Sequence, residues 1–151
     1  MANVEQNILI AANPERVWQA LTGEISRWWT PPYLRDAGRA SGLVMEPRVG
    51  GRLMEPWDDQ GVAGYLIGHV VEWLPPQRLA CTWMEKAWSG ISTFVSVELT
   101  QEGQNTRVSL LHQGFERLPD GAMQSAGFSE GWAELLNHCK AYVEQRSPHQ
   151  A

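Results

Sequence analysis

The chain has 151 residues, a formal net charge of −5 and a hydrophobic fraction of 43%, values typical of one globular domain (1–151) rather than a disordered chain. Lys and Arg occur only as isolated residues, so the sequence lacks the clustered positive charge needed to bind nucleic acid or an anionic membrane. The eight Trp residues, more than Phe and Tyr together, favour a cavity or an interface over a purely aliphatic core.

The N-terminal part predicts a strand followed by a helix. Residues 4–10, VEQNILI, alternate partly in polarity and contain β-branched side chains, which is typical of a strand. Asn13 is a predicted N-cap, and Pro14 suits the first helical position. We expect this helix to end at Gly23.

Two adjacent tryptophans follow, in the segment SRWWTPPYL. We expect Trp28 and Trp29 to lie on a short helical turn that Pro31 and Pro32 bring to an end. One indole would then anchor in the core while its neighbour borders a cavity, so the two should differ in burial.

The middle of the chain predicts an antiparallel meander. Strand-like segments run from GLVMEP at residue 42 to TRVSLLHQGF at residue 106, and short turns such as DDQG and QEGQN separate them. The alternation in the last two strands places one set of side chains on a buried face. That set comprises Val95, Val97, Leu99, Val108, Leu110 and His112.

Residues 120–145 predict one long helix. Phe128, Trp132 and the apolar residues that follow at helical spacing form one stripe, and Gly127 and Gly131 flatten the surface beside it. The predicted class is therefore α+β, with a curved antiparallel sheet of about six to seven strands around this helix and one or two short helices after the first strand. A void where the sheet and the helix diverge is a natural site for a small molecule.

Motifs for metal, cofactor or nucleophilic chemistry are absent from the sequence. No two of the four histidines have the spacing of metal ligands, so we expect neither a metal nor a cofactor. Cys81 and Cys139 are expected to be free, buried thiols. The N-terminus has no pattern of a signal peptide and no segment is long enough to span a bilayer, which predicts a cytoplasmic protein.

His112 is the main candidate for catalysis, since a buried imidazole can meet a ligand. The alternative, a core histidine satisfied by a backbone carbonyl, is favoured somewhat over a functional role. Glu46 and Glu55 are weaker candidates for a general acid or base.

Several aromatic residues are candidates for ligand binding. Trp83 and Trp132 lie on regular apolar stripes and are expected in the core, whereas those at the ends of elements suit packing and cavity lining equally. The candidate ligand-binding set is Trp28, Trp29, Trp57, Tyr65, Trp83, His112, Phe128 and Trp132.

The phrases PERVWQALT, RWW, VGGRL, GHVVEWLPPQRLACTW, NTRVSLLHQGF and EGWAELLNHCKAYV occur in this order. Together they resemble bacterial single-domain proteins similar to the activator of heat-shock protein 90 ATPase, in the START-like (SRPBCC) superfamily that includes the birch-pollen allergen. The resemblance implies a helix-grip fold, a cavity for hydrophobic or amphipathic molecules, Trp28 and Trp29 near its entrance, and His112 at an inward-facing position.

Three functions follow in order of preference. The first is binding of a small hydrophobic or aromatic ligand in an interior cavity. The second is a cyclase or dehydratase acting on an aromatic or polyketide-like substrate, and the third is a co-chaperone-like interaction module. Either a monomer or a homodimer is compatible with all three.

Overall fold

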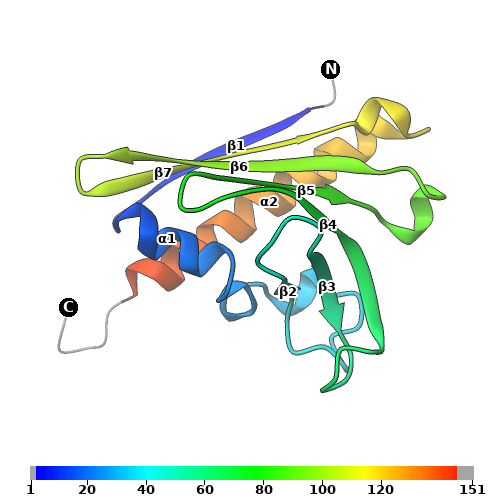
Figure 1. Ribbon diagram of the computed structural model, residues 1–151. Helices are drawn as coiled ribbons and strands as arrows, with labels where there is room; N and C mark the ends of the chain where they lie inside the picture. The colour runs from blue at the N-terminus through cyan, green and yellow to red at the C-terminus, as the bar shows by residue number, and fades with distance from the viewer. Residues whose placement is uncertain (1–2, 146–151) are drawn as a thin grey trace.

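The computed structural model describes residues 3–145. Seven strands form one antiparallel sheet in the order β1-β7-β6-β5-β4-β3-β2, and the long helix α2 runs along one face of it (Figure 1). The predicted helix-grip architecture is confirmed.

The strands are β1 (Val4–Ile10), β2 (Val44–Met45), β3 (Arg52–Pro56), β4 (Gly64–Leu74), β5 (Arg78–Trp83), β6 (Thr93–Glu102) and β7 (Asn105–Gln113). The helices are α1 (Pro14–Leu21) and α2 (Gly121–Glu144), and short 3₁₀ turns cover Ile25–Arg27, Pro31–Tyr33, Lys86–Trp88 and Phe115–Arg117. The strand predicted from GLVMEP is reduced to Val44–Met45, because the proline that follows cannot donate a ladder hydrogen bond.

Helix α1 begins as its sequence predicts. The Asn13 side chain accepts a hydrogen bond from the backbone N–H of Arg16 at 2.8 Å, and Pro14 takes the first helical position. The helix ends at Leu21, two residues before Gly23, and the Thr22 hydroxyl donates to a carbonyl of the last turn.

The predicted faces of the last two strands are confirmed. Residues alternate between buried and more exposed along β6 and β7, and His112 lies on the buried face with no exposed surface. This face covers α2, whose stripe of Trp132, Leu135, Leu136, Cys139 and Val143 is buried.

Strand β4 bends because it serves two partners. One part pairs with β3 and the other with β5, and the register shifts in both pairings. At the bend, Gly68 approaches β5 so closely that a Cβ atom would lie 1.8 Å from the Thr82 carbonyl oxygen. A glycine is required here, and the bend directs β3 and β2 away from the plane of the other strands (Figure 1).

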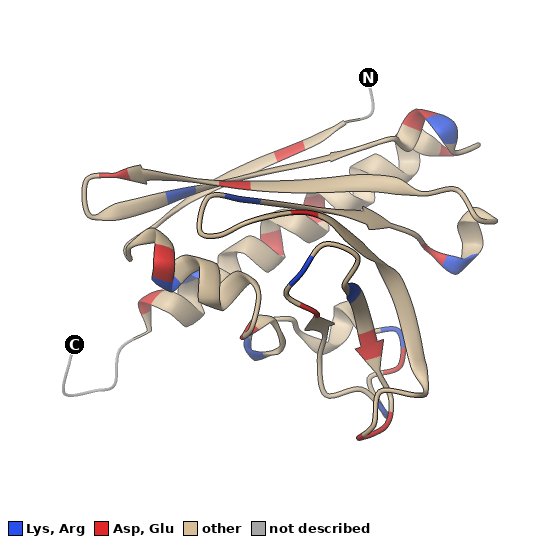
Figure 2. Ribbon diagram, in the orientation of Figure 1, with Lys and Arg blue, Asp and Glu red and all other residues tan. Residues whose placement is uncertain are grey.

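Charged residues of both signs are interspersed over the described residues (Figure 2). Most of the arginines there pair with a carboxylate, as Arg16 does with Glu24 and Arg107 with Glu102. Between residues 3 and 145 no helix combines the length and apolar character needed to cross a membrane.

Candidate functional site

Trp28 and Trp29 lie between two 3₁₀ turns and both point into the protein. Their exposed fractions are 5% and 6%, so the prediction that they differ in burial is wrong. The reason is that each indole finds its own buried acceptor. The Trp28 N–H donates to the Ala20 carbonyl at 2.7 Å, and the Trp29 N–H donates to the Tyr33 carbonyl at 3.0 Å.

The two prolines have a different role from the one predicted. The first turn already ends at Arg27, and Pro31 and Pro32 begin the second turn, Pro31–Tyr33. Proline suits this position because the first residues of a helix need no N–H donor. The turn projects Tyr33 toward α2, where its hydroxyl donates to Glu134 at 2.5 Å.

A groove of about 390 Å³ lies between this segment, the N-terminal half of α2 and the end of β5. Its lining comprises Trp29, Pro32, Tyr33, Leu34, Arg35, Trp83, Glu85, Met123, Gln124, Gly127, Phe128, Gly131, Trp132 and Leu135. The segment and the helix thus form its two walls.

Five of the fourteen residues that line the groove are aromatic. Trp83 lies in edge contact with Trp132 at 5.2 Å and with Phe128 at 6.3 Å between ring centroids. Trp29 completes the surface at 6.1 Å from Trp83. The helix approaches as a flattened surface because Gly127 has open space where a side chain would stand.

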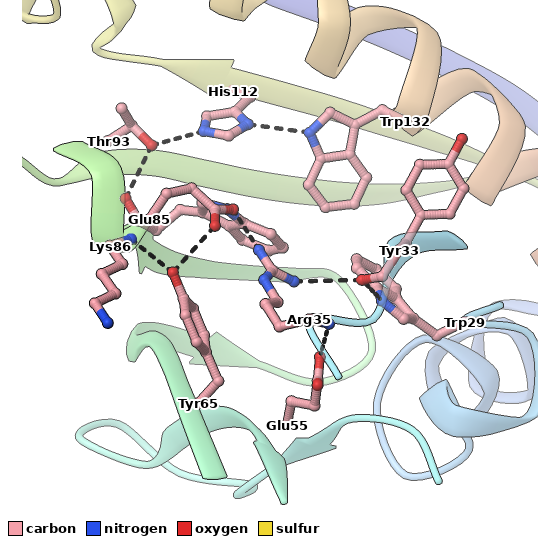
Figure 3. Close-up of polar contacts among 11 residues, drawn as sticks. Trp29, Tyr33, Arg35, Glu55, Tyr65, Glu85, Lys86, Thr93, His112 and Trp132 are labelled. Atoms are coloured by element: carbon pink, nitrogen blue, oxygen red, sulfur yellow. Dashed lines mark hydrogen bonds and ion pairs between the residues drawn. The ribbon is translucent and has the colours of Figure 1, made fainter. Parts of the chain in front are cut away.

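One end of the groove is polar. Arg35 forms an ion pair with Glu85, and the two side chains are only 19% and 21% exposed. Glu85 also accepts hydrogen bonds from the Tyr65 hydroxyl at 3.2 Å and from the Trp83 N–H at 3.0 Å (Figure 3). The carboxylate is therefore held in one orientation from three sides.

Glu55 fixes the groove wall from behind. This carboxylate is fully buried on β3 and accepts the backbone N–H groups of Arg35 and Asp36 at 2.7 and 2.8 Å. It also accepts the Trp57 N–H at 2.8 Å. Glu55 is not among the lining residues, so it acts as a structural anchor of the wall.

Glu46 lies outside the groove as well. It forms an ion pair with Arg52 at 3.0 Å, and hydrogen bonds from the Arg52 side chain lower the pKa of Glu46 to about 2. A carboxylate held ionised in this way is a poor general acid.

His112 is part of a buried hydrogen-bond chain. Its Nδ1 accepts the Trp132 N–H at 3.0 Å, which places the ring proton on Nε2, 2.7 Å from the Thr93 hydroxyl oxygen. That hydroxyl in turn donates to the Trp83 carbonyl at 3.0 Å. Burial lowers the pKa of His112 to about 3. The imidazole is thus neutral, and both of its nitrogens are occupied within the core.

A second, much smaller cavity lies deeper, between the sheet and α2. It measures about 50 Å³ and presents only apolar surface. Trp28 lines this cavity and not the groove. The interior void that we expected is thus reduced to this small cavity, which four tryptophans help to line, and the larger of the two spaces is the groove.

Comparison with known proteins supplies the family. The family model described as "Activator of Hsp90 ATPase homolog 1-like protein" matches residues 11–144. The chain belongs to this family. No curated protein matches it.

Solved structures of similar proteins share the fold. Protein MLL2253 from Mesorhizobium loti has a TM-score of 0.73 at 21% identity, with 96% of this chain and 98% of that chain covered. The Aha1 dimer from Colwellia psychrerythraea has a TM-score of 0.69 at 23% identity, over 95% and 97%. The anthrahydroquino-gamma-pyrone synthase Txn09, solved as a complex with a ligand, has a TM-score of 0.62 at 29% identity, over 91% and 97%.

Within this member of the family, the candidate ligand-binding residues separate into three places. Four of them line the groove, namely Trp29, Trp83, Phe128 and Trp132. Trp28 lines the inner cavity. The other three lie outside both linings: Tyr65 supports Glu85, Trp57 packs beneath Arg39, and His112 holds Trp132.

Arg35, Glu85 and Tyr33 are groove residues that the sequence did not single out. Arg35 and Glu85 are separated by 50 positions, and neither belongs to a local motif. The one available signal was the position of Glu85 just after the strand segment LACTW, where side chains often face a site. Across residues 3–145 the structure shows no group of three or more His, Cys, Asp or Glu side chains able to hold a metal ion.

Proposed function

We propose that the groove binds a flat aromatic molecule that carries a keto or hydroxyl oxygen at one edge. The observation that carries this proposal is the composition of the lining: five aromatic residues and one ion pair, Arg35 with Glu85. The volume of about 390 Å³ lies within the range of small-molecule sites.

The polar end favours a neutral oxygen over an anion. A guanidinium has five N–H donors. Only some of the Arg35 donors are occupied, by Glu85 and by the Tyr33 carbonyl. The remaining donors suit a carbonyl or phenolic oxygen. The adjacent Glu85 carboxylate would repel a ligand carboxylate or phosphate.

A relative supports the choice of a fused ring system. The protein that is 29% identical to this chain is an anthrahydroquino-gamma-pyrone synthase and was solved with a ligand. A polycyclic aromatic ligand is also what the edge-on arrangement of Trp83, Phe128 and Trp132 would accommodate by ring contacts.

Calorimetric titration with 1,8-dihydroxyanthraquinone tests the proposal. Phe128→Ser removes a ring from the groove, and Phe94→Ser removes a ring that is 40% exposed on β6 and outside the groove. We expect Phe128→Ser to weaken binding at least tenfold and Phe94→Ser to leave it unchanged, with both variants checked for folding by circular dichroism. Absence of binding to the unmodified protein, or equal effects of the two changes, would refute it.

A cyclase-type enzyme is the second candidate, because the groove holds one oriented carboxylate beside a guanidinium. Glu85 would accept a proton from a carbon next to a ketone, and Arg35 would stabilise the enolate oxygen that forms. Exchange of the α-hydrogens of 1-tetralone with solvent deuterium, followed by NMR, tests this role. The unmodified protein should accelerate the exchange and Glu85→Gln should not. Equal rates would eliminate the enzyme hypothesis.

The co-chaperone function, the cytoplasmic location and the choice between monomer and homodimer stay predictions. The Colwellia psychrerythraea protein is described as a dimer. Sedimentation velocity on this chain would decide its own state.

A further inference from the structure

The groove and the inner cavity are separated by three side chains. Among residues 3–145, only Trp29, Trp83 and Trp132 line both spaces. Every other lining residue belongs to one space alone. We call these three residues the tryptophan partition.

The partition is closed by ring contacts and by hydrogen bonds. The three ring centroids lie 5.2 to 6.1 Å apart, so each indole touches the other two. Each N–H also has an acceptor: the Tyr33 carbonyl for Trp29, Glu85 for Trp83 and His112 for Trp132. The rings are thus held both by contact with one another and at their polar atoms.

Trp29 differs from the other two in where it is attached. Trp83 belongs to strand β5 and Trp132 to helix α2, whereas Trp29 lies on the irregular link between two 3₁₀ turns. Its hydrogen-bond acceptor, Tyr33, belongs to the same segment. Replacement of Trp29 therefore opens the partition without removing a side chain from the sheet or from the long helix.

We infer that the tryptophan partition makes the groove selective for ring systems over extended alkyl chains, and that Trp29 sets this selectivity. The inference rests on the proposed binding function. A flat ring can lie against the partition within the groove. An alkyl chain needs apolar depth, and the wholly apolar inner cavity that would supply it lies behind Trp29.

Trp28 provides a matched control, because it lines the inner cavity and not the groove. Trp28→Ala and Trp29→Ala each remove one indole from the lining of the inner cavity. Trp28→Ala leaves the partition intact, whereas Trp29→Ala opens it. Calorimetric titration of both variants and of the unmodified protein with 1-decanol and with 1,8-dihydroxyanthraquinone compares the two ligand classes. We expect Trp29→Ala to bind 1-decanol at least tenfold more tightly than either of the other two proteins.

Two results would overturn the inference. One is an equal gain of 1-decanol affinity in Trp28→Ala, which would show that the volume of the inner cavity, and not the opening of the partition, determines the affinity. The other is tight binding of 1-decanol by the unmodified protein. Failure of the unmodified protein to bind the anthraquinone refutes the proposed function instead, and the comparison of the two variants with 1-decanol still decides the role of the partition. If Trp29→Ala does not fold, Trp29→Leu and Leu136→Ala, at another inner-cavity position, replace the pair.

Discussion

Replacement of Gly127 by Ala should raise the stability of the fold and lower the affinity of the groove for a ligand. A Cβ atom at this position meets no atom within 4 Å, so the substitution introduces no clash. Alanine is favoured over glycine inside a helix by about 1 kcal/mol, and in a protein of this size that raises Tm by about 2–4 °C. The added methyl group projects into the groove, so the affinity for 1,8-dihydroxyanthraquinone should fall. Thermal melting and calorimetric titration measure the two effects.

Gly131 supplies the control for this prediction. It faces the same groove one turn later, but a Cβ atom there would lie 3.3 Å from the Tyr33 ring. The hydrogen bond from Tyr33 to Glu134 at 2.5 Å keeps that ring from moving away. Gly131→Ala should therefore gain less stability than Gly127→Ala. A lower Tm for Gly127→Ala than for the unmodified protein would refute the reasoning.

Three further predictions concern buried polar groups. Because the pKa of His112 is lowered to about 3 in the folded protein, only the unfolded chain binds a proton just below pH 6.5, and stability is lost as the pH falls. Denaturant unfolding at pH 7 and at pH 5 measures this loss. Between the two pH values the free energy of unfolding should fall by about 2 kcal/mol more in the unmodified protein than in His112→Gln. Equal losses in the two proteins would contradict the prediction. Glu55→Gln replaces one of the two accepting oxygens by an NH₂ group, which cannot accept the backbone N–H groups of Arg35 and Asp36. The free energy of unfolding should therefore fall by about 1–3 kcal/mol. A change near zero in the same assay would show that other contacts hold the wall. Burial raises the pKa of Cys81 and of Cys139 to about 12. Iodoacetamide at pH 8 should therefore label both thiols only after unfolding. Detection of either labelled thiol in the native protein by mass spectrometry would disprove this.

Periodic features of the fold could be predicted from the sequence. The spacing of Trp132, Leu135 and Leu136 requires a helix with one apolar stripe, and the alternation that ends at His112 requires a strand with one buried face. Such patterns depend on the geometry of a single element. For that reason the long helix, the meander and the inward direction of His112 were all correct.

The candidate site depends on contacts that no local pattern encodes. The segment around Arg35 has no regular structure of its own, and its position is set by Glu55 on strand β3, twenty residues away along the chain. Trp28 and Trp29 were expected to face different environments because adjacent side chains diverge. Both are buried all the same, because helix α1 supplies an acceptor for Trp28 at Ala20 and the turn Pro31–Tyr33 supplies one for Trp29 at Tyr33.

The attachment of the groove wall through its backbone has a consequence for how this protein can diversify. Glu55 holds the N–H groups of Arg35 and Asp36, which every residue except proline possesses. The side chains at positions 35 and 36 can therefore be exchanged while the anchor stays in place. The backbone anchor and the side chains of the wall are in this way supplied by different atoms, so a library randomised over these two positions, with proline left out, should yield many folded proteins with an altered groove.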